Sequence, residues 1–320
     1  MLSRTADHLF WQSRYMERAE NTARLLDVNY QASLLPQSPE VALAGWRSLL
    51  SIYELLPAYT ARHGEIDARR VQEFIVGDEM SPSSILSCLR AARENARAVR
   101  GTLTTEVWET TNQTWIEFRQ QLKSGLLARD PAALFEWVKL RAHLARGVTL
   151  GTMLQDEAVD FLRIGSYLER ADNTARMLDV KFHAVVGEPR EPSEDEAGAS
   201  RNAAAEFYHW SSVLRSVSGF EVYRKAYSNV IVPEKVAQLL ILNGAMPRSL
   251  AHCMGRVLHS LRRVANAQSE ETLRLAGKLK AELDYAHIDE ILATGLHAYL
   301  TQFLKRVGDL GSDISRDFLT

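Results

Sequence analysis

The chain has 320 residues, 46% hydrophobic and 24% charged, which is ordinary for a globular protein with a large core. Its formal net charge of −2 argues against a general polyanion-binding role, so no nucleic-acid partner is expected. The amino-terminal stretch has no apolar signal core and no segment approaches membrane-spanning length, so we expect a cytoplasmic protein without a membrane partner. Two Cys exclude a disulfide framework and are expected to be buried.

Helical signals follow one another along the chain. Residues 4–32 and 156–186 are long, free of Pro and rich in Ala, Leu and Arg. A capping Ser or Asp followed by Pro predicts the start of a helix at Ser38-Pro39, Ser81-Pro82 and Asp130-Pro131. Gly147 predicts the end of the helix that starts at Pro131. Because alternating β-branched runs are nearly absent, the sequence predicts an all-α multi-helix bundle.

A fourteen-residue segment occurs twice. Residues 15–28 read YMERAENTARLLDV and residues 167–180 read YLERADNTARMLDV, with eleven identities at an offset of 152. A second pair of segments, starting at Val71 and Val236, aligns Ser84 with Ser249 and Cys88 with Cys253 at an offset of 165. These matches predict two tandem repeats.

We expect a first helical repeat at 1–151 and a second at 152–320, related by a pseudo-twofold axis and packed as one compact body. The change in offset comes from an insertion at 187–202, GEPREPSEDEAGASRN. Its acidic, Pro-, Gly- and Ser-rich composition predicts a mobile surface loop.

Placed on a helix, the repeated segment has a polar stripe opposite an apolar face of small residues. The stripe of the first copy is Arg14, Glu17, Glu20, Asn21, Arg24 and Asp27. The stripe of the second copy is Glu169, Asp172, Asn173, Arg176 and Asp179.

Three interpretations of the stripes stay open. They can be solvated faces with i,i+4 ion pairs, a buried hydrogen-bonded network, or the lining of a ligand or partner site. In the third case the catalytic candidates are Glu17 and Glu169 as acid/base, which requires a cavity and a raised pKa. The sequence contains no nucleotide-binding loop and no metal motif with a repeat counterpart, so neither cofactor nor metal is expected.

The opening LSRTADHLFWQSRYMERAENTARLLDV, the block PSSILSCLRAARENARAVR, the later YLERADNTARMLDV and MPRSLAHC resemble the bacterial alpha-E domain family over the full chain. The resemblance implies an all-helical fold. It also implies genomic company with a circularly permuted ATP-grasp ligase and a transglutaminase-like peptidase, and hence a system that forms and breaks amide or peptide bonds.

Two further sets of residues match the family pattern. Arg93, Glu94 and Asn95 form a charged cluster on the helix after Pro82, either as a surface network or as part of a site shared with the stripes. Arg248 and Ser249 lie at a helix start, where they can cap the helix or hold an anion.

Three functions follow as hypotheses. The first is a non-catalytic helical component that binds the ATP-grasp ligase or its peptide substrate. The second is an enzyme acting on a small amide-containing or zwitterionic substrate in a pocket formed by the repeated helices. The third is a purely structural role for the repeated motif.

Overall fold

A computed structural model describes residues 1–186, 196–227 and 229–319, with side chains except in 183–186 and 196–205. Every regular element in these ranges is a helix, so the predicted all-α fold is confirmed. The helices before residue 153 are α1 (Ser3–Ser33), α2 (Pro39–Ile52), α3 (Leu56–His63), α4 (Ala68–Gly77), α5 (Ile85–Ala98), α6 (Thr105–Lys123), α7 (Leu126–Arg129) and α8 (Pro131–Thr152).

The remaining chain continues in the same manner. Its helices are α9 (Glu157–Val186), α10 (Glu196–Ser216), α11 (Phe220–Ala226), α12 (Pro233–Leu242), α13 (Leu250–Arg263), α14 (Glu270–Tyr285), α15 (Ile288–Thr294) and α16 (Leu296–Ile314), followed by one π-helical turn at Ser315–Leu319. Of the expected loop at 187–202, residues 187–195 lie outside the described residues. For residues 196–202 the predicted loop is wrong. These residues are helical, because the Ala-rich sequence of this segment favours α10.

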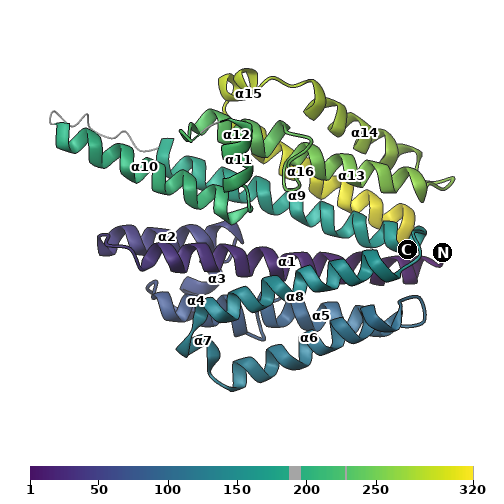
Figure 1. The fold of residues 1–320 in the computed structure, drawn as a ribbon. Coiled ribbons are helices and arrows are strands. Elements are labelled where there is room, and N and C mark those ends of the chain that lie inside the picture. The colour runs from purple at the N-terminus through teal and green to yellow at the C-terminus, as the bar shows by residue number, and fades with distance from the viewer. Residues whose placement is uncertain (187–195, 228, 320) are drawn as a thin grey trace.

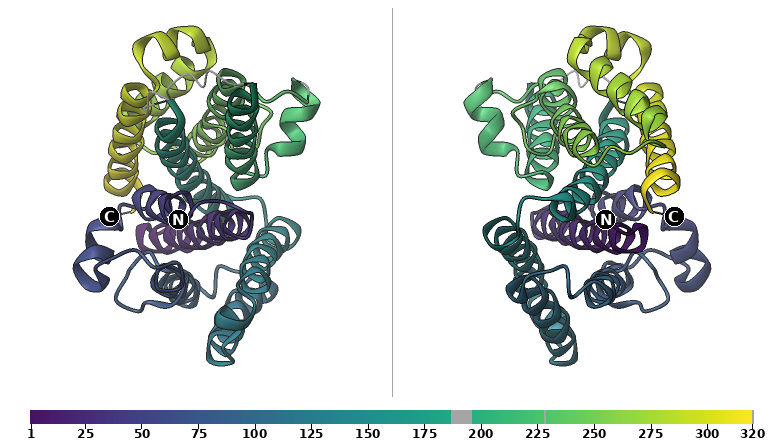
Figure 2. Two further views of the ribbon diagram at one scale, coloured as in Figure 1. Left: turned by 90° about the vertical axis from the view of Figure 1, so that its left-hand side faces the viewer. Right: turned by 90° about the vertical axis from the view of Figure 1, so that its right-hand side faces the viewer.

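The two long helices α1 and α9 pack against each other at the centre (Figure 1). Helices α5 and α8 pack on α1, and α6 packs on both of them. Helices α13 and α16 pack on α9, and α14 packs on both of them. Figure 2 shows the segments from α4 to α8 on one side of this central pair and most of those after α9 on the other, while α2 packs against both α1 and α9.

Side-chain caps begin α2, α4, α5, α6, α8 and α13. Ser38 accepts a hydrogen bond from the Val41 N–H, and Asp130 accepts one from the Ala133 N–H, as expected for the predicted starts. The predicted start at Ser81-Pro82 is wrong. Ser84 caps α5 instead, because its hydroxyl accepts the Ser87 N–H and donates to the Asp78 carbonyl.

The predicted helix end at Gly147 is also wrong, because α8 continues to Thr152. An interior glycine costs a helix only about 1 kcal/mol, so packing overrides it. Val148 packs against the core directly after this glycine.

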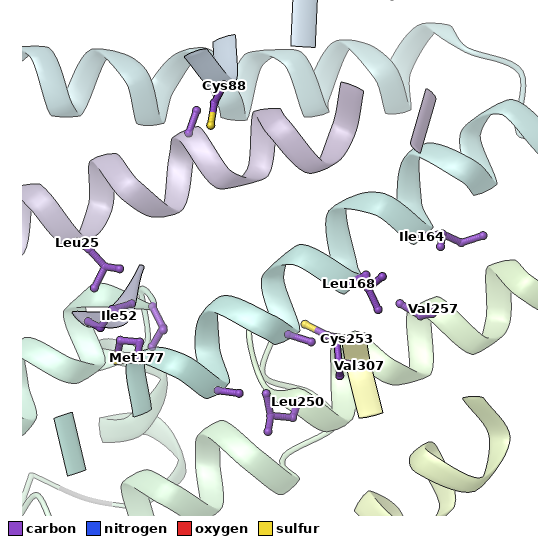
Figure 3. Packing of buried hydrophobic residues seen from close by; sticks show 14 of the residues in the cluster. Leu25, Ile52, Cys88, Ile164, Leu168, Met177, Leu250, Cys253, Val257 and Val307 are labelled. Atoms are coloured by element: carbon purple, nitrogen blue, oxygen red, sulfur yellow. The ribbon is translucent and has the colours of Figure 1, made fainter. Parts of the chain in front are cut away.

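The two cysteines are fully buried, as expected. Figure 3 shows Cys88 beside α1, and Cys253 beside Leu168 of α9 and Val307 of α16. Burial raises the pKa of both thiols to about 12, so they act as small core side chains and not as nucleophiles.

Candidate functional site

The two repeated segments meet where α1 and α9 cross, and they exchange ion pairs reciprocally. Arg170 donates to both carboxylate oxygens of Glu17, from Nε and Nη2, at 2.8 Å each. Arg18 does the same to Glu169, at 2.5 Å from Nε and 3.0 Å from Nη2. Each Glu-Arg dipeptide therefore binds the other one, in an arrangement that we call the ER clamp: Glu17, Arg18, Glu169 and Arg170.

The clamp lies in the interior of the protein. Glu17 is 2% exposed and Glu169 is 4% exposed, and Arg14 adds a third guanidinium contact to Glu169 at 2.9 Å. Bidentate guanidinium–carboxylate pairs are among the strongest hydrogen-bonded arrangements in proteins, and burial removes the competing water. The solvated-face interpretation is therefore wrong for the amino-terminal part of both stripes.

A second layer of arginines surrounds the first-copy carboxylates. Arg248 donates to Glu17, Glu20 and Asn21, and its Nη1 lies 2.6 Å from the Asn21 Oδ1. Arg146 of α8 donates to Glu17 and Glu20. Arg24 donates to Glu20 at 2.7 Å. Glu17 and Glu20 thus bind four guanidinium groups, and we call these six residues the carboxylate cluster: Glu17, Glu20, Arg24, Arg146, Arg170 and Arg248.

These contacts determine how the carboxylates titrate. Burial alone raises the pKa of Glu17, but Arg170, Arg248 and Arg146 outweigh it and hold that pKa well below its usual range. The pKa of Glu20 and that of Glu169 are lowered against burial in the same way. The pKa of Glu17 and that of Glu169 are thus lowered, whereas an acid/base carboxylate at neutral pH requires a raised pKa.

The carboxyl-terminal part of each stripe lies apart from the clamp, in ordinary ion pairs and hydrogen bonds. Asp27 pairs with Lys139 of α8 at 2.6 Å. In the second copy, Asp172 pairs with Arg176 at 2.8 Å, Asn173 accepts from the Tyr53 hydroxyl at 3.4 Å, and Asp179 bonds to His297 at 2.8 Å.

The two remaining candidate sets have different surroundings. Arg93 and Glu94 pair with each other, while Asn95 bonds to His8 and Arg93 to Asn112, so the Arg93-Glu94-Asn95 cluster forms a local network instead of joining the clamp. Ser249 caps α13 by accepting the His252 N–H. Arg248, directly before it, is brought into the carboxylate cluster.

Three of the residues that build the ER clamp and the carboxylate cluster were missed from the sequence: Arg18, Arg170 and Arg146. A signal existed for the first two, because both are identical in the repeated segments. On the helix, each arginine lies about 100° from the glutamate before it and therefore outside the polar stripe. Each one binds the glutamate of the other long helix, across the contact between α1 and α9. Arg146 has no repeat counterpart that marks it.

A cleft with a volume of ≈ 160 Å³ opens beside the carboxylate cluster, between α1, α8, α9 and α13. Met16, Ala142, Leu150, Val159 and Leu162 form apolar walls. Its polar lining includes Gln12, Glu17, Glu20, Arg146, Arg170 and Arg256. The interpretation of the stripes as part of a cavity lining thus applies to Glu17 and Glu20, while Glu169 lies elsewhere.

The pKa of His143 in α8 depends on the charges of the carboxylate cluster. This pKa is lowered by burial and by the positive charges of Arg146, Arg24 and Arg248, against the opposing effect of Glu20. We expect Arg146→Met to raise the His143 pKa and Glu20→Gln to lower it further, as measured by NMR titration of the imidazole. The exposed Arg274→Met is the control and should leave the His143 pKa unchanged; equal shifts in all three variants would contradict this account.

Comparison with known proteins finds a family with the same dipeptide. A family model described as a predicted alpha-helical domain with a conserved ER motif matches residues 1–319. That dipeptide occurs here at Glu17-Arg18 and Glu169-Arg170, the four residues of the clamp.

Curated relatives are uncharacterised mycobacterial proteins. One from Mycobacterium bovis and one from Mycobacterium tuberculosis are each 23% identical over 337 residues, covering 99% of this chain and 36% of the relative. The chain thus spans about a third of the length of the relatives that it matches. No solved structure matches it. Within the described residues, no helix is both long and apolar enough to cross a membrane.

Proposed function

Since the chain belongs to the Alpha-E family, we propose that it is a non-catalytic helical component of a bacterial peptide- or amide-modifying system. In this role it binds an ATP-grasp-type ligase or the peptide substrate of that ligase, in the cytoplasm, with a transglutaminase-like peptidase as a further partner. The observation that carries the proposal is the cleft, whose arginines outnumber its carboxylates. The identity of the partners rests on the family resemblance.

A binding role is favoured over an enzyme with Glu17 or Glu169 as acid/base. A general acid at neutral pH needs a pKa near the working pH, whereas the pKa of both carboxyls is lowered. Both carboxylates also have their oxygens occupied by guanidinium groups. Their role in the proposal is structural: they hold α1 and α9 in a constant position beside the cleft.

We further propose that the chain consists of two tandem repeated halves related by a local twofold axis through the clamp. The reciprocity of the Glu17–Arg170 and Glu169–Arg18 pairs supports this, because two equivalent surfaces across a twofold axis exchange contacts in this way. So does Gly165, which aligns with Ser13 at the repeat offset: a Cβ on Gly165 would lie 2.3 Å from the Ser13 Oγ.

A second exchange supports the same axis. Arg24 donates to Ser218 of the second half, and its repeat counterpart Arg176 donates to Glu54 of the first half. Ser218 and Glu54 are 164 residues apart, and both have a left-handed backbone, with φ of 51° and 56°. The matching buried pair Trp46 and Trp210 has the same offset.

Native affinity purification tests the proposed function. The tagged chain is purified from a bacterium that encodes it, beside Arg256→Met and the exposed control Arg274→Met, and mass spectrometry quantifies the retained proteins and peptides. We expect an ATP-grasp-type ligase, or a peptide lost from Arg256→Met only, to be enriched over an untagged control. Enrichment of neither would overturn the proposal.

A further inference from the structure

The buried cluster beside the cleft contains more positive than negative charge. Among the described residues, two carboxylates, Glu17 and Glu20, bind four guanidinium groups in this cluster. Four positive and two negative charges leave a net charge of +2. Arg248 is 7% exposed, and its pKa is lowered by burial despite both carboxylates. Excess buried charge is costly in free energy, so an additional anion would stabilise the cluster.

The cleft gives an anion access to this charge. Arg146 lines the cleft and has a side chain that is 33% exposed. Arg256 of α13 lines it too, and its guanidinium lies 5.8 Å from the ring centroid of Tyr167. Arg256 makes no hydrogen bond or ion pair to any residue that the structure describes. Its donors are therefore free to bind a ligand, and those of Arg146 are within reach of the same space.

A buried acceptor in the same lining lacks a donor. Gln12 is 6% exposed, and its side-chain oxygen has no hydrogen-bond partner among the described residues. Leaving a buried carbonyl without a hydrogen-bond donor is unfavourable, and a ligand that brings an N–H group would supply that donor. Gln12 thus complements the arginines: they bind a carboxylate, and it binds an amide N–H.

The size and the walls of the cleft limit the rest of the ligand. Its volume of ≈ 160 Å³ is close to the ~150 Å³ of a cavity that holds benzene, and well below the ~300–1,000 Å³ of sites for drug-sized ligands. Met16, Leu150, Val159 and Leu162 offer apolar contacts. The space suits one apolar side chain and not a whole cofactor.

We propose that the cleft binds the carboxyl-terminal residue of a peptide. Arg256 and Arg146 bind the terminal carboxylate, Gln12 accepts the N–H of the last peptide bond, and the apolar walls surround an aliphatic side chain. This deepens the proposed function, on which it rests, by naming the part of the peptide that is recognised.

The repeat explains why such a site forms once. The counterpart of Ser166, which lines the cleft, is Arg14 on α1. Arg14 lines an equivalent hollow on the other side of the helix pair, with Asp172 as the counterpart of Glu20. Among the described residues, Arg14 is the single arginine in the lining of that hollow, and it is already bound to Glu169, so we expect one peptide per chain.

Calorimetry with the purified full chain tests the inference. The probes are N-acetyl-Ala-Leu as the free acid and the same dipeptide as its carboxyl-terminal amide, with wild type, Arg256→Met and the control Arg274→Met. We expect the acid to bind wild type and the control with a stoichiometry of one. The amide on wild type, and the acid on Arg256→Met, should each bind at least about tenfold more weakly, because each loses a charged hydrogen bond.

A second readout separates loss of binding from loss of structure. Saturation with the acid should raise the His143 pKa, since the charge of the bound carboxylate offsets the arginines that lower this pKa. Unchanged thermal unfolding of Arg256→Met would show that the variant is folded.

Equal affinity for acid and amide, equal affinity of wild type and Arg256→Met, or displacement of the acid by equimolar acetate or inorganic phosphate would overturn the inference. A ligase that co-purifies although the acid does not bind would leave the proposed function standing without this site.

Discussion

Replacing Glu17 by Gln should lower the free energy of unfolding by about 3–5 kcal/mol, the usual effect of removing one partner of a buried ion pair. The change leaves Arg170 buried with half of its bidentate partner, and it weakens the pairs with Arg248 and Arg146. Urea and thermal unfolding would measure the loss. At about 2–4 °C for each kcal/mol in domains of 150–250 residues, Tm should fall by roughly 6–20 °C.

The matched control is Glu271→Gln, which removes an ion pair with Arg274 on the surface. Both side chains of that pair are more than half exposed and screened by water, so little change in the free energy of unfolding is expected. The double variant Glu17→Gln/Arg170→Met should lose less stability than the sum of its single variants, because it removes both charges together. Additive effects, or equal losses at Glu17 and Glu271, would show that the clamp does not act as a buried unit.

The loss at Glu17 should also depend on pH in a defined direction. The native pKa of Glu17 is lowered from an ordinary value of 4.5, so its stabilising contribution is complete above that value. The contribution decreases as the pH falls from there through the lowered native pKa. The stability difference between wild type and Glu17→Gln should therefore be constant from pH 6 to 8 and shrink below pH 4.5; a constant difference at all pH values would contradict the ion-pair explanation.

Gly165→Ala should destabilise the protein by about 1–3 kcal/mol or more, although alanine is normally the better helix former by roughly 0.5–1 kcal/mol. An added Cβ would lie 2.3 Å from both the Phe10 carbonyl oxygen and the Ser13 Oγ of α1. The serine can rotate, but the carbonyl belongs to the α1 backbone and cannot move without shifting the helix crossing. Chemical denaturation would measure the loss.

Gly277→Ala in α14 is the control for this prediction. No atom lies within 4 Å of a Cβ at Gly277, so the substitution should be neutral or stabilise the protein by about 0.5–1 kcal/mol. The two substitutions are chemically identical and differ only in what the added methyl group meets. Effects of the same sign at the two positions would show that α1 and α9 are not in contact at Gly165.

Local features of the sequence were sufficient to predict the helical architecture. Ser38 and Asp130 cap the helices expected of them, because a cap depends on residues three positions apart. The predictions failed where competing local signals were similar in strength. Ser84 caps α5 in place of Ser81, and the glycine at 147 is tolerated inside α8 because core packing outweighs helix propensity there.

The sequence alone also determined that the repeated polar residues matter, because charged side chains kept in both copies need a cause beyond packing. Only the tertiary structure decided which charges meet. Glu17 finds Arg170 at a separation of 153 residues, and Arg248 arrives from another helix start 231 residues away. Periodicity describes the faces of a single helix, whereas the pairing of charges, the cleft and its excess of guanidinium groups depend on how distant helices cross.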